Sequence, residues 1–218
     1  MSCSKVRIDV QDGIYPPSED SILMLEATKY AHGDVLDMCA GSGVIGLNAA
    51  ERARHVTLVD INRKAVDAIE NNAAVNRIEN VTAIVSDLFK KLDGKRFDVI
   101  YCNPPYLPGS AMKKDWLDTA IVGGSKGYEI TTRILKDMKR HMTRGGTAFM
   151  ILSTVYDIDK IYKLLRSLEF SFKKIKTIEF FFEELILIKI YEKRRSSNLQ
   201  RPDSASSNNR RKRAYIQA

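Results

Sequence analysis

The sequence predicts an α/β fold: a Rossmann-like doubly wound sheet of about seven strands, mostly parallel, with an antiparallel C-terminal hairpin strand. Three observations support this fold class. Short apolar runs typical of buried parallel strands alternate with segments of helical periodicity. A glycine-rich loop follows the first of these runs. The last two apolar runs have no helix between them, which favours antiparallel pairing.

The predicted elements follow one another without an internal repeat. A helix is expected to start within 15–21, where two prolines precede two acids. The predicted strands are 34–38, 55–60, 81–85, 97–102, 147–153, 172–178 and 185–191. The further predicted helices run from the glycine loop to about Arg52, then over 62–76, 128–142 and 157–168. Asn62 is expected to cap the second of these, and Gly145-Gly146 to close the third.

Length and charge indicate one domain, residues 1–192, followed by a basic tail, residues 193–218. The 218 residues suffice for a sizeable core. The tail carries eight basic side chains against one acid, Asp203, which accounts for +7 of the formal net charge of +8. The folded part is therefore close to neutral. A tail so poor in apolar residues is expected to be disordered. A nucleic-acid contact, a solvated appendage and added sequence are all open interpretations of it.

Several function classes are not expected from the composition. No stretch is apolar for long enough to span a bilayer, and residues 1–5 do not resemble a signal peptide. The three cysteines lack CxxC spacing and the three histidines do not cluster. We therefore expect neither a metal site nor a disulfide framework, and a cytoplasmic location.

The glycine loop indicates a ligand with an adenosine part. Residues 41–46 fit G-x-G-x-x-G between a strand and a helix, and Asp60 ends the next strand, where an acid can bind ribose. This pattern alone would also suit a dinucleotide. Asp37, directly before the loop, opposes a pyrophosphate and favours a cationic ammonium group. An adenosine joined to an amino acid, as in S-adenosylmethionine, satisfies both conditions.

Two further segments offer polar groups to such a cofactor. Asp87, just past the third predicted strand, could accept from the adenine amino group, with Leu88 against the base. Capping of a following helix is an equally good role for Asp87. Ser18 is expected to cap the first helix, whereas residues 19–21 could close over the cofactor.

Asn103, Pro104, Pro105 and Tyr106 are the most informative residues of the chain. The two prolines cannot extend the preceding strand, so the chain leaves the sheet in a stiff turn at its ligand-binding edge. The Asn103 oxygen and a proline carbonyl can accept the two hydrogens of a planar amino group, on which the Tyr106 ring stacks. We predict catalytic roles for Asn103, Pro104 and Tyr106, and substrate contacts for Asn103, Pro105 and Tyr106.

These motifs resemble the class I S-adenosylmethionine-dependent methyltransferases, and especially the short archaeal and eukaryotic HemK-type release-factor glutamine methyltransferases. The resemblance covers about residues 14–153. Its more specific parts are Tyr-Pro-Pro-Ser-Glu-Asp-Ser at 15–21 and Gly-Gly-Ser-Lys-Gly at 123–127. Pro17 replaces a usual alanine, and Cys39 and Ala40 fall at variable positions. The helical substrate domain of the bacterial enzymes is not expected before Ile14.

The resemblance implies methyl transfer to the glutamine amide in the Gly-Gly-Gln loop of a class I translation release factor. It also implies a small zinc-binding activator subunit, which would pair with the strand at 81–85 if that strand is a sheet edge. The predicted cofactor contacts are Ser21, Asp37, Cys39, Gly41, Gly43, Asp60, Ile61, Asp87, Leu88 and Asn103.

Other functions stay open at this point. A DNA or RNA methyltransferase acting on an exocyclic adenine or guanine amine uses similar chemistry but should carry a basic surface, which the near-neutral core disfavours. A dehydrogenase is disfavoured by Asp37, and a non-catalytic binding module by the intact acids and glycines. The segment 107–126, with Trp116, is expected to face the substrate because long connections in compact domains are usually functional.

Overall fold

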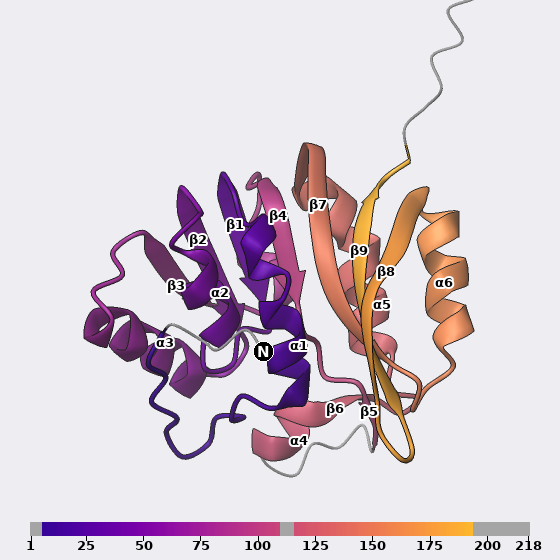
Figure 1. Cartoon of the computed structure of the whole chain (residues 1–218), viewed down its shortest axis with the longest axis horizontal. Coiled ribbons are helices and arrows are strands. Elements are labelled where there is room, and N and C mark those ends of the chain that lie inside the picture. The colour runs from indigo at the N-terminus through magenta and orange to yellow at the C-terminus, as the bar shows by residue number, and fades with distance from the viewer. Residues whose placement is uncertain (1–5, 110–115, 194–218) are drawn as a thin grey trace, which may run out of the picture.

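The computed structural model describes residues 6–109 and 116–193 of the chain (Figure 1). Within these residues seven strands form one sheet in the order β3-β2-β1-β4-β7-β9-β8. Strands β1 to β4 and β7 are parallel, β9 is antiparallel to β7, and β8 is antiparallel to β9. The bounds are β1 Asp34–Met38, β2 His55–Asp60, β3 Val81–Val85, β4 Phe97–Cys102, β7 Met142–Ser153, β8 Phe170–Glu179 and β9 Glu184–Glu192. The predicted fold class is confirmed, and β3 is an edge of the sheet as expected.

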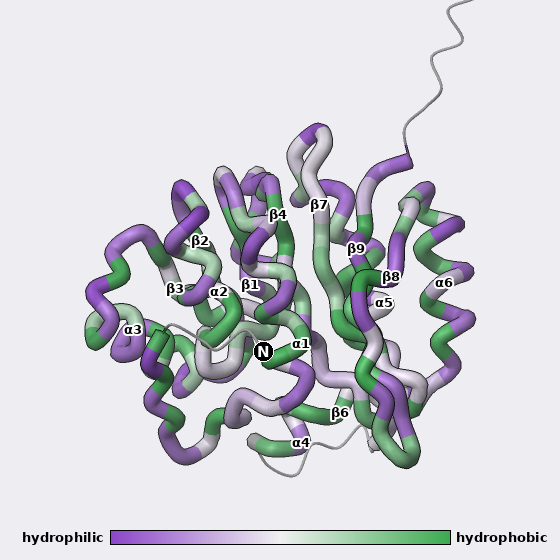
Figure 2. The backbone as a smooth tube through the Cα atoms, viewed as in Figure 1, coloured by the Kyte–Doolittle hydropathy of each residue, from purple (hydrophilic) through white to green (hydrophobic). Residues whose placement is uncertain are grey.

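Helices cover both faces of this sheet (Figure 1). The α-helices are α1 Glu19–Leu25, α2 Val44–Ala49, α3 Arg63–Val75, α4 Trp116–Ile121, α5 Glu129–Met138 and α6 Ile158–Ser167. Three short 3₁₀ helices, η1 Thr28–Tyr30, η2 Leu88–Lys91 and η3 Lys139–His141, complete the described helical segments. In Figure 2, α6 alternates between hydrophobic and hydrophilic residues, the pattern of a helix that buries one side. None of the described helices is long and apolar enough to cross a membrane.

Side chains alternate between two cores, one on each face of the sheet. In β4, Val99 and Tyr101 join the core under α1, α2 and α3, whereas Ile100 and Cys102 join the core under α5 and α6. Successive residues of a strand point to opposite faces, so a strand covered on both faces must be apolar throughout. The one buried hydroxyl of this strand, on Tyr101, donates to the Ala27 carbonyl at 3.1 Å.

Two predictions about helix ends are wrong. The helical segment predicted over 128–142 is α5 followed directly by η3 to His141, but Gly145-Gly146 lies inside β7 instead of closing it. The pairing of β7 with β4 shifts register between Phe97 and Val99, and a Cβ at Gly146 would approach the Phe97 carbonyl oxygen to 3.0 Å. The glycines therefore accommodate an irregular stretch of strand. Ser18 precedes α1 but does not cap it, because its hydroxyl donates to the Glu19 carboxylate.

The Asn62 cap is confirmed: its side-chain oxygen accepts from the Lys64 backbone amide at 3.0 Å. The segment predicted as one long loop contains α4 and a small parallel pair, β5 Leu107–Pro108 and β6 Val122–Gly124. The basic tail from residue 194 onward lies outside the described residues, so the boundary near 193 stays a prediction.

Candidate active site

The carboxyl ends of four neighbouring strands place the predicted motifs in one row. From the β3 edge inward, Asp87 follows β3, Asp60 ends β2, Cys39 follows β1 and Asn103 follows β4. Neighbouring strands lie about 4.8 Å apart, so the row is about 14 Å long. Residues separated by up to 64 positions in sequence thus form one extended site.

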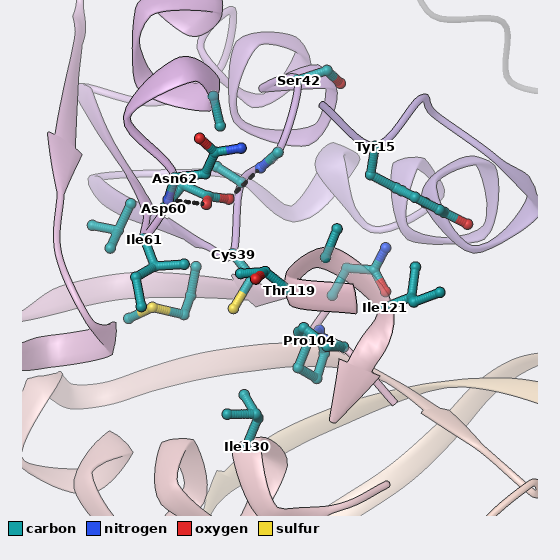
Figure 3. A pocket seen from close by; sticks show the side chains of 18 of the residues that line it. Tyr15, Cys39, Ser42, Asp60, Ile61, Asn62, Pro104, Thr119, Ile121 and Ile130 are labelled. Atoms are coloured by element: carbon teal, nitrogen blue, oxygen red, sulfur yellow. Dashed lines mark hydrogen bonds between the residues drawn. The ribbon is translucent and has the colours of Figure 1, made fainter. Parts of the chain in front are cut away.

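A cavity of about 230 Å³ lies over this row (Figure 3). It is lined by the predicted residues Ser21, Cys39, Gly41, Asp60, Ile61, Asp87, Leu88, Asn103, Pro104, Pro105 and Tyr106. Residues not predicted as site residues also line it, among them Ile14, Tyr15, Asp20, Ser42, Asn62, Thr119, Ile121, Ile130 and Arg133. Thr119 and Ile121 belong to α4, which supports a ligand-facing role for the 107–126 segment. The prediction for the Trp116 side chain lies outside the described part of the chain.

Asp37 and Gly43 were predicted as cofactor contacts but do not line the cavity. Asp37 is fully buried behind the glycine loop, and its Oδ2 accepts from the Gly46 amide at 2.8 Å. Its Oδ1 is buried without a hydrogen-bond partner among the described residues. Burial, together with the charge of Asp60, raises the Asp37 pKa to about 7. Asp37 is therefore a buried acceptor whose charge depends on what binds next to it.

Gly46 permits the close approach that creates this contact. A Cβ at Gly46 would lie 2.6 Å from Leu58 Cδ2 and 2.9 Å from Asp37 Oδ2. Only glycine lets α2 pack this tightly on β1 and β2, which is the role of the third glycine in G-x-G-x-x-G loops. The loop motif thus has a packing function here as well as a binding function.

Asp60 anchors the glycine loop from the next strand. Its two carboxylate oxygens accept from the Gly41 and Asn62 backbone amides, each at 2.8 Å (Figure 3). Burial raises the Asp60 pKa. Each oxygen keeps a second lone pair, so the carboxylate can also accept from two ribose hydroxyls. Ile61 beside it is 54% exposed and offers an apolar surface to a base.

Asp87 is held by two cations. Arg133 Nη2 lies 2.8 and 2.9 Å from its two oxygens, and Lys90 Nζ lies 2.8 Å from Oδ2. The hydrogen bond from Lys90 and the pairing with Arg133 lower the Asp87 pKa. Asp87 stands at the N-cap position of η2, but its side chain makes no capping hydrogen bond. The ionised carboxylate therefore lines the cavity and does not cap the backbone of η2.

The turn formed by residues 103–106, called the Asn103 turn below, carries the second buried acceptor of the site that lacks a hydrogen-bond partner among the described residues. Asn103 Oδ1 is buried and has no hydrogen-bond partner among the described residues, although Asn103 lines the cavity. An unsatisfied buried acceptor costs about 1–3 kcal/mol, so a ligand that donates to it gains correspondingly. This is the geometry expected of an acceptor reserved for a substrate N–H.

Tyr106 completes this end of the cavity as a neutral aromatic ring. It is half-buried and packs against both cores. Burial, then the charges of Asp20 and Glu183, raises the Tyr106 pKa, so its hydroxyl stays protonated at neutral pH. The rim of the cavity next to Tyr106 is therefore acidic.

Two glycines of the 123–127 segment, Gly123 and Gly127, allow close packing against the backbone of the Asn103 turn. A Cβ at Gly123 would lie 2.4 Å from the Pro105 carbonyl oxygen, and one at Gly127 would lie 2.6 Å from the Tyr106 carbonyl oxygen. β6 and the turn after it can pack on the backbone of residues 105–106 only because these side chains are absent. This contact gives a physical reason for finding the glycines at 123–127 together with the Asn103 turn, which lies about twenty positions earlier in the sequence.

The described lining fits an adenosine with an amino-acid end better than a dinucleotide. Among the described lining residues the one Lys or Arg is Arg133, and it is paired with Asp87. The glycine loop therefore has no basic partner for a pyrophosphate, while Asp37 lies buried behind it. Asp60 and Asp87 can accept hydrogen bonds from a nucleoside, and the buried Asp37 can stabilise the charge of an ammonium group.

Comparison with known proteins identifies the family of the chain. The family model described as "Methyltransferase small domain" matches residues 18–180. A putative protein N5-glutamine methyltransferase of Methanocaldococcus jannaschii is 33% identical over 187 residues, covering 84% of this chain and 94% of the relative. A release factor glutamine methyltransferase of Borreliella burgdorferi is 30% identical, covering 66% and 59%. A ribosomal protein uL3 glutamine methyltransferase of Francisella tularensis is 38% identical, covering 51% and 38%. The chain thus spans the archaeal relative but less than two thirds of the two bacterial ones.

Solved structures give the same fold. The E. cuniculi Mtq2–Trm112 complex, described as responsible for methylation of the translation termination factor eRF1, has a TM-score of 0.66 at 22% identity. The match covers 83% of this chain and 99% of that one. At such identity the likeness establishes the fold. The family match and the archaeal relative establish that this chain belongs to the methyltransferase small domain family and is an S-adenosylmethionine-dependent methyltransferase.

Proposed function

We propose that this enzyme methylates the side-chain amide nitrogen of the glutamine in the Gly-Gly-Gln loop of a class I translation release factor. The observation that carries the proposal is the buried, unpaired Asn103 Oδ1 at the cavity, on a turn stiffened by two prolines. The archaeal relative supports a protein glutamine as the acceptor, and the Borreliella burgdorferi relative supports a release factor as the substrate.

The row of acids would hold the cofactor. S-adenosylmethionine supplies an electrophilic methyl group on a sulfonium. Asp60 would accept from the ribose hydroxyls, and Asp87, fixed by Arg133, would accept from the adenine amino group. Leu88 and Ile61 provide apolar contacts for the base, and Asp37 supplies negative charge beneath the amino-acid end. This orientation leaves Asn103 and Tyr106 for the acceptor.

The Asn103 turn activates the acceptor by positioning it. An amide nitrogen is a poor nucleophile because its lone pair is delocalised. Asn103 Oδ1 and the Pro104 carbonyl accept its two hydrogens, which orients the nitrogen and stabilises positive charge as it develops. The neutral Tyr106 ring stacks on the planar amide. No general base is required before transfer, and the released proton goes to water.

The acidic rim favours a protein acceptor over a nucleobase. Asp20, Glu183 and Glu19 lie close enough to Tyr106 to raise its pKa electrostatically. A nucleic acid would bring phosphates past these carboxylates, and nucleic-acid binding depends on basic side chains at that place. A protein loop with neutral or basic neighbours meets no such repulsion.

An activator subunit is part of the proposal. β3 is a terminal strand of the described sheet, and a shallow hollow beside it is lined mainly by apolar residues of α3, β3 and the segment between them, including Ile69, Ala73, Ile78, Val81 and Ala83. An apolar edge strand invites pairing with a partner. The E. cuniculi neighbour is a complex with Trm112. We infer that a small zinc-binding subunit pairs with β3. Action on release factors places the enzyme in the cytoplasm.

Labelled S-adenosylmethionine distinguishes the candidate substrates. The enzyme, with its activator subunit, is incubated separately with a full-length class I release factor, ribosomal protein uL3 and total RNA. We expect label in the release factor, and none after its Gly-Gly-Gln glutamine is replaced by asparagine. Label in uL3 alone would reassign the protein substrate, in line with the Francisella tularensis relative. Label in RNA alone would refute the proposal.

A further inference from the structure

The tip of the β8–β9 hairpin exposes aromatic residues that the fold does not require. Residues 180–183 connect the two strands, and Phe180 N donates to the Glu183 carbonyl at 2.7 Å, which closes the turn. Phe181 and Phe182 are 92% and 90% exposed, and their rings pack edge to face with centroids 4.6 Å apart. Hairpin turns favour glycine, asparagine and aspartate. Paired exposed rings at such a place indicate a binding function.

This aromatic tip, defined as Phe181 and Phe182, lies at the end of the sheet that carries the active site. Glu183, the next residue, accepts from Ser153 Oγ at 2.7 Å, and Ser153 ends β7 at the same sheet edge as Asn103. The charge of Glu183 also contributes to the raised pKa of Tyr106 and of Tyr15, both of which line the cavity. In the view of Figure 1 the hairpin end and the small sheet of β5 and β6, which follows the Asn103 turn, lie at the same end of the molecule.

The surroundings of the tip indicate which partner it contacts. The charges of Glu19, Asp20 and Glu183 act on Tyr106 and Tyr15 in the cavity wall, and Glu183 directly follows Phe182, so the rim near the tip is acidic. An anionic membrane or nucleic acid would be repelled there, whereas a basic protein surface would be attracted. Aromatic side chains are also the usual anchors of protein interfaces. The surface that reaches this rim during each reaction is the one around the reactive glutamine.

We propose that Phe181 and Phe182 dock the protein substrate by packing on apolar side chains of a basic surface of the release factor. This inference rests on the proposed function, because it assumes a protein acceptor. The rings make contact away from the reacting atoms, so they contribute to binding of the whole substrate and not to the methyl-transfer step.

Steady-state kinetics with a full-length class I release factor test the docking role. In F181A/F182A we expect KM for the release factor to rise about 10- to 100-fold, as for loss of paired interface anchors, while kcat at saturation and the Kd for S-adenosylmethionine stay unchanged. F181Y/F182Y, which keeps the aromatic surface, should keep a KM near that of the wild type. Tyr191→Ala, an exposed aromatic at the other end of β9, serves as the matched control and should leave KM unchanged.

The outcomes separate the two proposals. If the wild-type enzyme does not methylate the release factor, the proposed function fails, and the docking role fails with it. If the wild type methylates it and F181A/F182A shows an unchanged KM, the docking role alone is overturned. A drop in kcat without a change in KM, or conversion of a dimer to a monomer in sedimentation with KM unchanged, would likewise overturn it.

Discussion

At the residue scale, the site is marked by two buried acceptors without partners. Asp37 Oδ1 and Asn103 Oδ1 are both unsatisfied among the described residues, although most buried polar groups in proteins are hydrogen-bonded. Asp37 lies in β1, and Asn103 directly follows the neighbouring strand β4, which pairs with β1 through Asp37↔Tyr101 and Met38↔Cys102. Asn103 lines the cavity, where a substrate amide can supply the missing hydrogen, whereas Asp37 lies behind the glycine loop and can act on a bound ammonium group through its charge.

Asn103→Ala should lower kcat by about 10²–10³, because an oriented acceptor that stabilises developing charge is lost. The Kd for S-adenosylmethionine, measured by calorimetry, should change little, since Asp60 and Asp87 are the residues proposed to hold the nucleoside. Asp60→Ala serves as the contrast and should weaken cofactor binding first. Full turnover by an Asn103→Ala enzyme that binds cofactor would contradict the assigned role.

Cofactor affinity should depend on the charge of Asp37. Its pKa is about 7 in the free protein because burial disfavours the carboxylate. A bound ammonium group favours the ionised form, so binding below about pH 7 must release a proton, and affinity should rise from about pH 5.5 to 7. The cofactor's own amino group stays protonated over this range.

Calorimetry in two buffers of different ionisation enthalpy measures that released proton directly. Asp37→Asn, which keeps the shape of the side chain but does not titrate, should bind more weakly and lose the part of the pH dependence due to Asp37. Wild-type affinity that stays flat between these pH values would contradict the role of Asp37.

At the element scale, strands buried on both faces were the most predictable features. The bounds of β1 to β4 coincide with the predicted ranges because continuous apolar runs end sharply at polar or turn residues. β5 and β6 could not be predicted because strands of two and three residues show no periodicity. Gly145-Gly146 has the composition of a helix end, and only the pairing of β7 with β4 reveals its place in a strand.

The parts of the candidate site that consist of a single sequence motif could be predicted. The glycine loop, Asp60, Asp87 and the Asn103 turn each follow a strand, and the parallel sheet brings strand ends together. Arg133 was not predicted because it meets Asp87 from 46 positions away, through the packing of α5. Tyr15 was singled out only as part of the 15–21 motif, and its place in the cavity wall is a tertiary contact.

Gly123→Ala should lower kcat by disturbing the Asn103 turn. The new Cβ would lie 2.2 Å from the Gly127 carbonyl oxygen and 2.4 Å from that of Pro105, so β6 or the turn must shift. A displacement of about 1 Å at reacting groups can cost about 10²-fold in rate. Gly94→Ala is the control: it adds backbone strain at a φ of +73° but meets no atom within 4 Å.

Thermal unfolding checks that the two glycine variants stay folded. We expect Gly94→Ala to lose a little stability and to keep its kcat. The role assigned to Gly123 would be wrong if its alanine variant kept the wild-type kcat, or if both variants lost activity equally.

At the scale of the whole molecule, three regions of the described domain are proposed to bind a ligand or a partner protein. The carboxyl ends of the parallel strands hold the cavity, β3 is an edge strand, and the β8–β9 hairpin turn lies at the same end of the sheet as the cavity. The formal charge of +8 belongs almost entirely to residues 193–218, so it does not indicate a basic surface on the domain. The domain is thus suited to bind a protein at its ligand edge and a second protein at β3.

Thr82→Arg should weaken binding of the activator subunit about tenfold or more. Thr82 is exposed on β3 and lines the apolar hollow, where a charged side chain would lose solvation in an interface. Thr177→Arg places the same change at an exposed threonine of β8, the opposite edge of the sheet, and should leave the affinity unchanged. Biolayer interferometry with the activator measures both, and equal affinities would contradict pairing at β3.

The most direct test of the central claim is tandem mass spectrometry of a class I release factor after reaction with the enzyme and S-adenosylmethionine. We expect the added mass of one methyl group on the glutamine of the Gly-Gly-Gln loop, on its side-chain amide nitrogen, and a strong loss of this product with Asn103→Ala. A methyl group on a lysine or another residue, or an unmodified release factor beside methylated RNA, would contradict it.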